Sequence, residues 1–249
     1  RRNAILEKLQ AERSVVVSEL GTLREVSEET IRRDLDKLEN AGYVIKSYGG
    51  AVLNENANLD LPFNIRKNRN VIGKQKIAEQ ISEMIHDGEH LFLDASSTAV
   101  AVAKAIKNKN DITVITNSLE IAIELLEAPG CTVISTGGLL MDTAFGFVGH
   151  ITDRAINSYC VDKAIISSKG IDLMAGFTDS DERHANNKKS MLAAAKEKIL
   201  AIDHSKFNKI SFAKIGDFRD LTKIVTDERP DEEWLQAFEE YKVDCIYSE

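Results

Sequence analysis

The sequence predicts an α/β protein with two modules: helices and a β-hairpin in the first, and a mostly parallel sheet in the second. Over residues 1–53, amphipathic helices precede two strand-like runs that flank a Gly-Gly pair. Over residues 71–249, short apolar runs alternate with amphipathic helices, which is typical of a parallel sheet covered on both faces. Residues 54–70 are polar and contain Pro62, so we expect a linker there.

Charge is distributed unevenly between these modules. Residues 1–53 hold nine Lys/Arg and nine Asp/Glu, whereas the rest of the chain holds 23 basic and 31 acidic residues and carries the whole net charge of −8. Overall acidity argues against a protein that coats nucleic acid by charge alone. A neutral module joined to an acidic one indicates two domains with different partners.

Composition also bears on the compartment. No apolar run approaches the roughly 18 to 20 residues of a membrane helix, and no signal peptide is visible, so we expect a cytoplasmic protein with no membrane partner. The cysteines are odd in number and far apart, which favours reduced, buried thiols over a disulfide framework or a zinc site. They are Cys131, Cys160 and Cys245.

The first module is expected to contain three helices. The first spans residues 2 to about 11 and carries its apolar side chains on one face. A short β-branched run at 15–17 comes next, after which Ser18 is expected to cap the second helix. Ser27 is expected to cap the third helix, which ends at Gly42.

The third helix is strongly amphipathic. Ile31, Leu35 and Leu38 fall at positions i, i+4 and i+7, which predicts a buried stripe. Two helices, a tight turn and a third helix with short polar and arginine residues near its start match helix-turn-helix DNA readers. In those proteins, this part of the recognition helix reaches base edges. The polar face and its flank carry Thr30, Arg32, Arg33, Asp34 and Lys37.

Strand-like runs at 43–45 and 51–53 come after this helix and are joined through the Gly-Gly pair, which predicts a β-hairpin. A hairpin after a recognition helix is a wing, and its tip can lie against backbone phosphate. The alternative is a small protein-binding domain in which Arg32 and Arg33 form a solvated face.

The string VSEETIRRDLDKLENAGYVIKSYGGAV resembles the N-terminal signature of the DeoR family of bacterial transcription regulators. Its motif runs V-S-x-x-T-I-R-R-D-L, then L-E-x-x-G, then a G-G-A hairpin, and every fixed position is met. The resemblance implies contacts with a double-stranded DNA operator, and Asp34 is expected to orient an arginine. The residues expected at the operator are Ser27, Glu29, Thr30, Arg32, Arg33, Lys37, Lys46, Tyr48 and Gly49.

A neutral DNA-binding module is expected to bind weakly alone, because non-specific affinity comes mainly from Lys and Arg on phosphates. We therefore expect a homo-oligomer, a dimer or a tetramer, that binds repeated half-sites.

The second module is expected to alternate strands and helices. Strands are predicted over 90–93, 113–115, 131–135, 161–167, 199–202, 223–225 and 244–247. Helices are predicted over 74–86, 99–107, 118–127, 185–197 and 231–242.

Polar loops come after six of these strands, at the edge of the sheet where ligands bind in such folds. Each loop alone is explained by ordinary helix capping, but together they suggest a small, polyhydroxylated, anionic ligand. Hydroxyls and free N–H groups at a helix start suit phosphate. The loops are 94–98, 116–118, 135–138, 167–170, 203–206 and 226–227.

Within these loops, D-x-S-x-T, T-N-S, G-G, K-G-I and D-H-S-K resemble the sensor domain of the same family, whose fold is similar to ribose-5-phosphate isomerase. The resemblance implies a phosphorylated sugar effector, usually one that relieves repression. Lys206 would meet phosphate or a sugar hydroxyl. The expected effector contacts are Asp94, Ser96, Ser97, Thr98, Asn117, Gly138, Lys169, Lys188, Asp203 and Lys206.

Two motifs depart from the family pattern. The first loop often reads D-S-G-T-T, and here it is D-A-S-S-T over residues 94–98. The helix near residue 184 often begins Glu-Ala, and here His184 replaces the acid, so any acidic contact there is lost.

The rival interpretation is a sugar-phosphate isomerase fused to a DNA-binding module. Such isomerases carry a D-G-A-D-E loop whose carboxylates transfer protons, and residues 167–171 lack those acids. The run Asp203-His204-Ser205 cannot line up as a catalytic relay, and the histidines lack metal-ligand spacing. We therefore expect no catalytic residues, metal or cofactor. A purely oligomerising second module is a third interpretation, which the loop chemistry disfavours.

Overall fold

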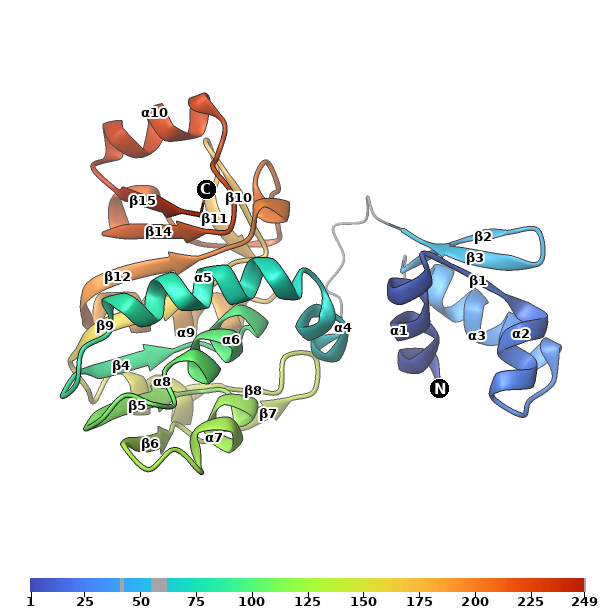
Figure 1. Cartoon of the computed structure of the whole chain (residues 1–249), viewed down its shortest axis with the longest axis horizontal. Helices are drawn as coiled ribbons and strands as arrows, with labels where there is room; N and C mark the ends of the chain where they lie inside the picture. Colours follow the sequence, from blue (N-terminus) through green and yellow to red (C-terminus); the bar gives the residue numbers. More distant parts are fainter. Residues whose placement is uncertain (41–42, 55–61, 249) are drawn as a thin grey trace. The chain divides into compact units, whose positions relative to one another are not determined.

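The computed structural model describes residues 1–40, 43–54 and 62–248. They form two compact units, Arg1–Arg69 and Asn70–Glu249 (Figure 1). Each unit is described by itself below.

The first unit is a helical bundle closed by a small antiparallel sheet. Its elements are α1 (Arg2–Glu12), β1 (Ser14–Val16), α2 (Val17–Leu23), α3 (Glu28–Asn40), β2 (Val44–Ser47), β3 (Gly50–Leu53) and α4 (Phe63–Asn68). The strand order is β1-β3-β2. The hairpin β2–β3 therefore gains a third strand, β1, which lies between α1 and α2 in the sequence. This is a winged helix-turn-helix arrangement, as the sequence predicted.

The core of this unit explains why the helices form where they do. The stripe Ile31, Leu35 and Leu38 of α3 is buried against α1 and α2, whose Leu9 and Leu20 are fully buried. In α4, Ile65 joins the same core. The segment expected to be a linker over 54–70 therefore contains a helix, while residues 55–61 lie outside the described ones, as does Gly42, the expected helix end.

Two local expectations in the first unit differ from the structure. Ser18 lies inside α2 and does not cap it: the helix begins at Val17, because Val16 is still extended and pairs with Gly50 across β1 and β3. The helical periodicity predicts Asp34 on the polar face of α3, but it is buried and forms an ion pair with Arg1, the residue before α1.

The second unit is built on a seven-stranded sheet with the order β15-β14-β12-β9-β4-β5-β6, in which every pair is parallel. The strands are β4 (His90–Leu93), β5 (Ile112–Thr116), β6 (Cys131–Ser135), β9 (Val161–Ile166), β12 (Ala195–Ala201), β14 (Lys223–Thr226) and β15 (Asp244–Tyr247). The predicted α/β class with a parallel sheet is confirmed.

Helices pack on this sheet and shield its apolar strands. α5, α6 and α7 lie side by side, and α8 packs against α9 (Figure 1). Their bounds are α5 (Val71–Met84), α6 (Ser97–Ala105), α7 (Leu119–Leu125), α8 (His150–Ile156), α9 (Glu182–Ala193) and α10 (Glu232–Tyr241). At the α10 end, Trp234 and Phe238 pack against Phe218 with ring centroids 5.7 and 5.6 Å away.

Two smaller sheets were not predicted. One is the hairpin of β7 (Leu139–Met141) and β8 (Gly146–Val148). The other has the antiparallel order β10-β11-β13, with strands Gly170–Asp172, Gly176–Asp179 and Ala213–Gly216. Short 3-10 turns at His204–Lys206 and Phe218–Asp220 complete the unit.

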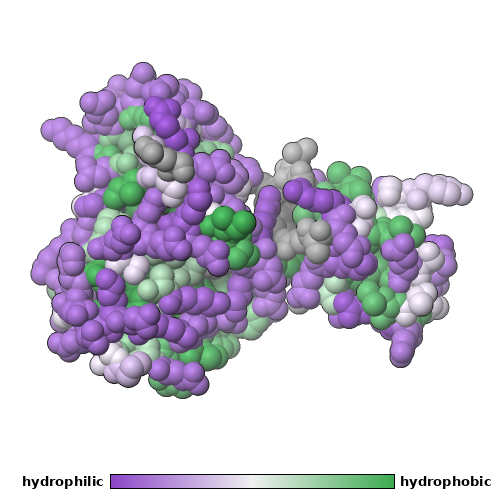
Figure 2. All heavy atoms as spheres, viewed as in Figure 1, coloured by the Kyte–Doolittle hydropathy of each residue, from purple (hydrophilic) through white to green (hydrophobic). Residues whose placement is uncertain are grey.

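The surface agrees with a chain that is polar outside and aliphatic inside. Figure 2 shows a mostly hydrophilic face with separate apolar patches. None of the helices within the described ranges has the length and apolar character needed to cross a membrane. All three cysteines are free thiols, but the expectation that they are buried is wrong: Cys131 and Cys245 are half-buried, and Cys160 is exposed.

Candidate functional site

The polar face of α3 begins at a well-formed helix cap. The N–H of Thr30 donates to Ser27 Oγ at 3.3 Å, and the two hydroxyls lie 2.9 Å apart. This cap satisfies an N–H group that the helix itself leaves unpaired. Because Ile31 points into the core, the side chains of Arg32 and Arg33 are left on the surface.

Both arginines form ion pairs one turn back along the same helix. Arg32 Nη2 lies 2.8 Å from Glu28 Oε2, and Arg33 Nε lies 3.4 Å from Glu29 Oε1. The side chains of Arg32 and Arg33 are 54% and 73% exposed. Exposed pairs at this spacing contribute only about 0.3–0.5 kcal/mol, so a phosphate or a base edge can replace the glutamates.

Asp34 does not orient either of these arginines. Its carboxylate accepts from Arg1 Nε, and this hydrogen bond holds the pKa of Asp34 below its ordinary value, although burial alone would raise that pKa. The pair fastens the start of α1 to the middle of α3, which is a structural contact inside the unit. The arginine that Asp34 positions is therefore Arg1.

The wing carries the remaining residues of the predicted DNA surface. Lys46 on β2 forms ion pairs with Asp36 and Glu39 of α3, so its ammonium is held beside the recognition helix. At the tip, Tyr48 is fully exposed, and Gly49 has φ +83°, a conformation that favours glycine. Lys37 is exposed on α3.

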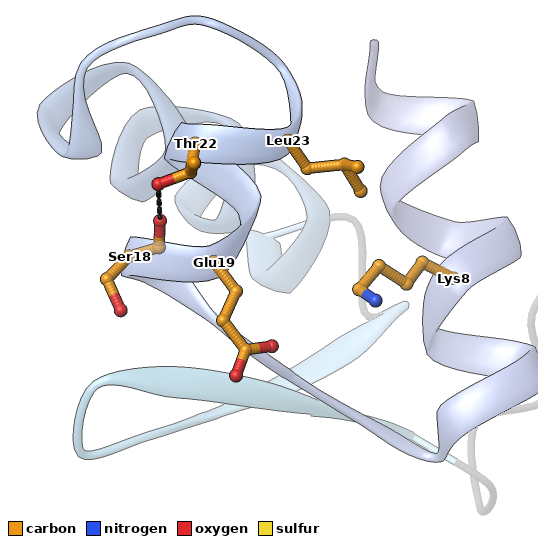
Figure 3. A pocket seen from close by; sticks show the side chains of 5 residues that line it. All are labelled: Lys8, Ser18, Glu19, Thr22 and Leu23. Atoms are coloured by element: carbon orange, nitrogen blue, oxygen red, sulfur yellow. Dashed lines mark hydrogen bonds between the residues drawn. The ribbon is translucent and has the colours of Figure 1, made fainter.

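A shallow groove between α1 and α2 lies apart from these residues (Figure 3). Lys8 and Leu23 point toward each other across it, and Thr22 Oγ1 donates to the carbonyl of Ser18 at 3.1 Å. Glu19 also lines the groove, and a carboxylate repels phosphate. None of the residues predicted to contact DNA lines this groove.

In the second unit, Lys188 of α9 joins two carboxylates at the carboxyl ends of the strands. Its Nζ lies 3.2 Å from Asp94 Oδ2 and pairs with Asp179, the last residue of β11. It also donates to the carbonyl of Ser167 at 2.7 Å. Burial lowers the pKa of Lys188, but the charges of Asp179 and Asp94 outweigh burial and raise it, so the ammonium stays charged.

The two carboxylates are held by further contacts. Asp94 Oδ2 accepts from the N–H of Ser167 at 3.0 Å, which links the ends of the neighbouring strands β4 and β9. Burial raises the pKa of Asp179, but Lys188 and then Lys169 lower it, and the net direction is downward. The predicted residues Asp94, Lys169 and Lys188 thus lie in one charge cluster.

Asn117, the residue after β5, is linked to α9 by a hydrogen-bond acceptor on β8 that it shares with Asn187. Its Nδ2 donates to the carbonyl of Phe147 at 3.0 Å, and Asn187 of α9 donates to the same carbonyl at 3.0 Å. A Cβ placed on Gly146 would lie 2.6 Å from Ala95 Cβ and 3.2 Å from His184 Cε1, so glycine is needed for this close approach. The ends of β4 and β5, β8 and α9 meet here.

The remaining predicted effector residues serve local structure as well. Ser96 Oγ accepts from the N–H of Ala99 at 3.0 Å and caps α6, with Ser97 and Thr98 buried in the first turn. Gly138 has φ +118°, and its close neighbour is Thr152 Oγ1 of α8, 2.3 Å from where a Cβ would lie. The geometry at Gly138 therefore reflects packing of α8.

Asp203 and Lys206 come after β12, which lies two strands from β4 in the same sheet. Asp203 is buried, and its Oδ1 accepts from the N–H of Ser205 at 3.1 Å. Burial raises the pKa of Asp203, but Lys206, Ser205 and Lys74 lower it, and the net direction is downward. This places a second, separately held charge group at the same edge of the sheet.

His204, Asp227 and Glu228 place one ligand atom each within 4.8 Å of one another, a spacing compatible with a metal ion. The Asp227 carboxylate, however, already accepts from the N–H of His204 at 2.7 Å, from His204 Nδ1 at 2.9 Å and from Asn70 Nδ2 at 2.9 Å. A carboxylate with three protein donors is a structural anchor. We assign no metal to this cluster.

Sequence reasoning missed four residues that the structure adds to the first cluster: Asp179, Ser168, His184 and Asn187. A signal existed for three of them. Ser168 lies in the predicted loop 167–170. His184 lies three residues before Asn187 and four before Lys188, so the three side chains share one side of α9. Asp179 carried no such signal, because its partner lies nine residues away on another element.

Comparisons with known proteins agree with this two-unit architecture. Residues 1–57 match the model of the DeoR-like helix-turn-helix domain, and residues 69–228 match that of the DeoR C-terminal sensor domain. The uncharacterized HTH-type transcriptional regulator YulB of Bacillus subtilis is 38% identical over 243 residues, covering 98% of this chain and 94% of the relative.

Other relatives are similar along nearly their whole length. HTH-type transcriptional regulator GolR of Listeria innocua is 32% identical over 96% of this chain and 94% of its own. The glycerol-3-phosphate regulon repressor of Escherichia coli is 28% identical over 98% and 96%. Among solved structures, ribose 5-phosphate isomerase A of Methanocaldococcus jannaschii is 16% identical over 54% of this chain and 53% of its own, with a TM-score of 0.40.

A winged helix-turn-helix joined to an α/β sensor domain defines a DNA-binding transcriptional regulator. The matches over both domains place the chain more narrowly: it belongs to the DeoR family of transcriptional regulators. This confirms the resemblance found in the sequence and the prediction that the chain is a regulator and not an enzyme.

Proposed function

We propose that this regulator is a repressor of sugar-metabolism genes and that a phosphorylated sugar or a related metabolite controls its DNA binding. The names of relatives support this, since they include a putative aga operon transcriptional repressor and a glycerol-3-phosphate regulon repressor. An L-fucose operon activator at 35% identity is the contrary example. The observation that carries the proposal is the buried charge cluster of Lys188, Asp94 and Asp179 at the strand ends.

We assign DNA reading to the exposed face of α3 and to the wing. Ser27, Thr30, Arg32 and Arg33 would contact the operator in the major groove, because their side chains lie near the N-terminal end of α3. Tyr48 and Gly49 at the wing tip would lie against backbone phosphate. Glu29, Lys37 and Lys46 flank these positions and complete the surface.

We assign effector binding to the carboxyl edge of the parallel sheet. The buried N-terminus of α6, with Ser96, Ser97 and Thr98, offers N–H groups and hydroxyls for an anion. Lys206 and Lys169 add positive charge at the same edge. Asp94, Asn117 and Asp203 would accept from sugar hydroxyls, and Gly138 would border the site.

We further propose that the chain acts as a homo-oligomer, a dimer or a tetramer, in which the effector changes the relative placement of the winged modules. Apolar side chains exposed beside the β10-β11-β13 sheet support an oligomer: Ile210 is 50% exposed and Phe212 is 85% exposed. Effector binding would alter the match between paired modules and the half-site spacing.

Two measurements test this function. A duplex selected from a random library by the full chain serves as the operator, and light scattering gives the number of chains bound to it. We expect two or four chains per duplex; one chain per duplex would refute the oligomer. Titrating triose, pentose and hexose phosphates into this complex should release or tighten DNA for at least one of them. A response to unphosphorylated sugars alone would refute the phosphate site.

A further inference from the structure

Five buried polar atoms around the Lys188 cluster have no hydrogen-bond partner among the described residues: Asp94 Oδ1, Asn117 Oδ1, Ser168 Oγ, His184 Nε2 and Asn187 Oδ1. The residues that bear them are 1%, 2%, 5%, 7% and 1% exposed. Buried polar groups are nearly always paired, because an unpaired one loses its hydrogen bonds to water without replacement. Several together at one place point to a bound ligand.

These atoms belong to one region of the fold. The backbone N–H of Ser167, the residue before Ser168, donates a hydrogen bond to Asp94 Oδ2. Asn117 and Asn187 share the Phe147 carbonyl. His184 lies against Gly146, the residue before Phe147. The five atoms therefore come from the ends of three neighbouring strands and from one face of α9.

Their chemistry selects the ligand. Three of the atoms, on Asp94, Asn117 and Asn187, are oxygens that accept hydrogen bonds. Ser168 can donate or accept. Burial and then the charge of Lys188 lower the pKa of His184, so its ring is neutral at neutral pH and offers one donor and one acceptor. A ligand group that fits this set donates several hydrogen bonds.

Hydroxyl groups meet that requirement, and carboxylate or phosphate groups do not. An ionised acid carries acceptors only, and here it would face three acceptor oxygens, one of them on the carboxylate of Asp94. We therefore propose that this inner site, Asp94, Asn117, Ser168, His184 and Asn187, binds the hydroxyl-bearing end of the effector, and that His184 helps to select it. The phosphate would lie outside it, at the N-terminus of α6 or near Lys206.

This inference rests on the proposed function and sharpens it. It states that the effector is a sugar phosphate or polyol phosphate with an uncharged, hydroxylated end. It also predicts that the matching sugar-acid phosphates, which carry a carboxylate at that end, bind poorly. The sequence predicts the loss of an acidic contact at His184, whereas this inference makes the imidazole ring itself a ligand contact.

The test uses the full chain and calorimetric titration with four probes: inorganic phosphate, glucose 6-phosphate, sorbitol 6-phosphate and 6-phosphogluconate. We expect a hexose or hexitol phosphate to bind at least about tenfold more tightly than both inorganic phosphate and the acid, since one lost hydrogen bond with an unpaired acceptor corresponds to about tenfold. Tighter binding of 6-phosphogluconate than of both glucose 6-phosphate and sorbitol 6-phosphate would overturn the inference but leave phosphate sensing intact. No binding by these three phosphates, together with no response of the operator complex to triose, pentose or hexose phosphates, would overturn both proposals.

Variants separate the inner site from the phosphate site. His184→Phe keeps an aromatic ring but removes both ring nitrogens, so it should lose about tenfold in affinity for the sugar phosphate. His184→Gln carries a polar group at this position, so it should retain part of the affinity that His184→Phe loses. Affinity for inorganic phosphate should not change in either.

Adjacent asparagines give a matched control. Asn187 is buried in the inner site, and Asn186 is exposed on the same helix. Asn187→Ala should weaken sugar-phosphate binding, and Asn186→Ala should not. Unchanged affinity in both His184→Phe and Asn187→Ala, with wild-type binding intact, would overturn the inference alone. If His184→Phe does not fold, Asn187→Ala and the probe series still decide.

Discussion

Lys188 Nζ lies 3.2 Å from Asp94 Oδ2 and pairs at the same time with Asp179, so a single buried ammonium joins the ends of β4 and β11. The side chains of all three residues are at least nine-tenths buried. Removing one partner of a buried ion pair leaves an uncompensated buried charge. The free-energy cost of that charge is larger than the net stability that the intact pair contributes.

Lys188→Met is therefore expected to destabilise the sensor domain by about 3–5 kcal/mol and to lower its melting temperature by roughly 6–20 °C. The double variant Lys188→Met with Asp179→Asn should be more stable than the single one, because one orphaned carboxylate is neutralised. Thermal melts monitored by circular dichroism check both. A double variant no more stable than Lys188→Met would show that the ion pair is not what fixes the lysine.

Arg33→Ala is expected to weaken binding to the selected operator by about tenfold or more, because its side chain is exposed beside the N-terminal end of α3. The loss of the Glu29 pair should change stability by less than about 0.5 kcal/mol. Fluorescence anisotropy with a labelled duplex gives the affinity, and melting gives the stability.

Lys8→Ala is the control for Arg33→Ala, since Lys8 also forms a surface ion pair at a spacing of four residues, but on α1. Its operator affinity should match that of the wild type. Equal losses in the two variants would indicate a general charge effect and would contradict a specific role for Arg33.

The wing offers a prediction on neighbouring glycines. Gly49→Ala should cost about 1 kcal/mol, because φ is +83° but nothing lies within 4 Å of a new Cβ. Gly50→Ala should cost at least about 2 kcal/mol, because that Cβ would lie 2.0 Å from the carbonyl oxygen of Val15 and force β1 away from β3. Urea unfolding of both variants tests the order; equal costs would contradict the close packing at Gly50.

The contacts of His204 predict a pH dependence. Burial lowers the pKa of His204, but the hydrogen bond and charge of Asp227, with Glu228 and Asp203, outweigh burial and raise it. A raised pKa in the folded state means that the protonated ring adds stability below its unfolded pKa of 6.5, and that this stability is lost as pH rises through the folded value.

His204→Gln should therefore melt about 1–3 °C below the wild type at pH 5.5, a small effect because the ring is 47% exposed, and the difference should shrink by pH 9. Melts across this pH range check the sign. A difference that grows with pH would contradict the assigned contact between His204 and Asp227.

Much of this fold could be predicted from local patterns. The α3 stripe of Ile31, Leu35 and Leu38 was readable because its spacing reflects the helical repeat. Strands β4, β6 and β15 have the bounds that the sequence predicts. β4 lies inside the sheet and is mostly buried, so it needs apolar side chains on both faces, whereas β6 and β15 are edge strands without a fully buried residue. The family signature added the class of regulator, which the domain matches confirmed.

Other features depended on contacts between distant segments. β10, β11 and β13 are three or four residues long, too short for a clear periodicity, and they form only because they pair with one another. Asp34 falls on the outer side of a helical wheel, but Arg1 supplies a partner that makes its burial favourable. Neither result is encoded in neighbouring residues.

By itself, the sequence determined the order along the chain of the seven strands of the parallel sheet, the helix that carries Arg32 and Arg33, and the polar residues directly after the strands, because each depends on side-chain periodicity or on the residues that follow a strand. Only the tertiary structure decided that Lys188 meets Asp94 and Asp179, and that His184 and Asn187, each with an unpaired buried atom, lie against β8 next to the strand ends. Those contacts depend on how α9 packs against the ends of strands that are distant from it in the sequence. Local sequence patterns do not predict such packing.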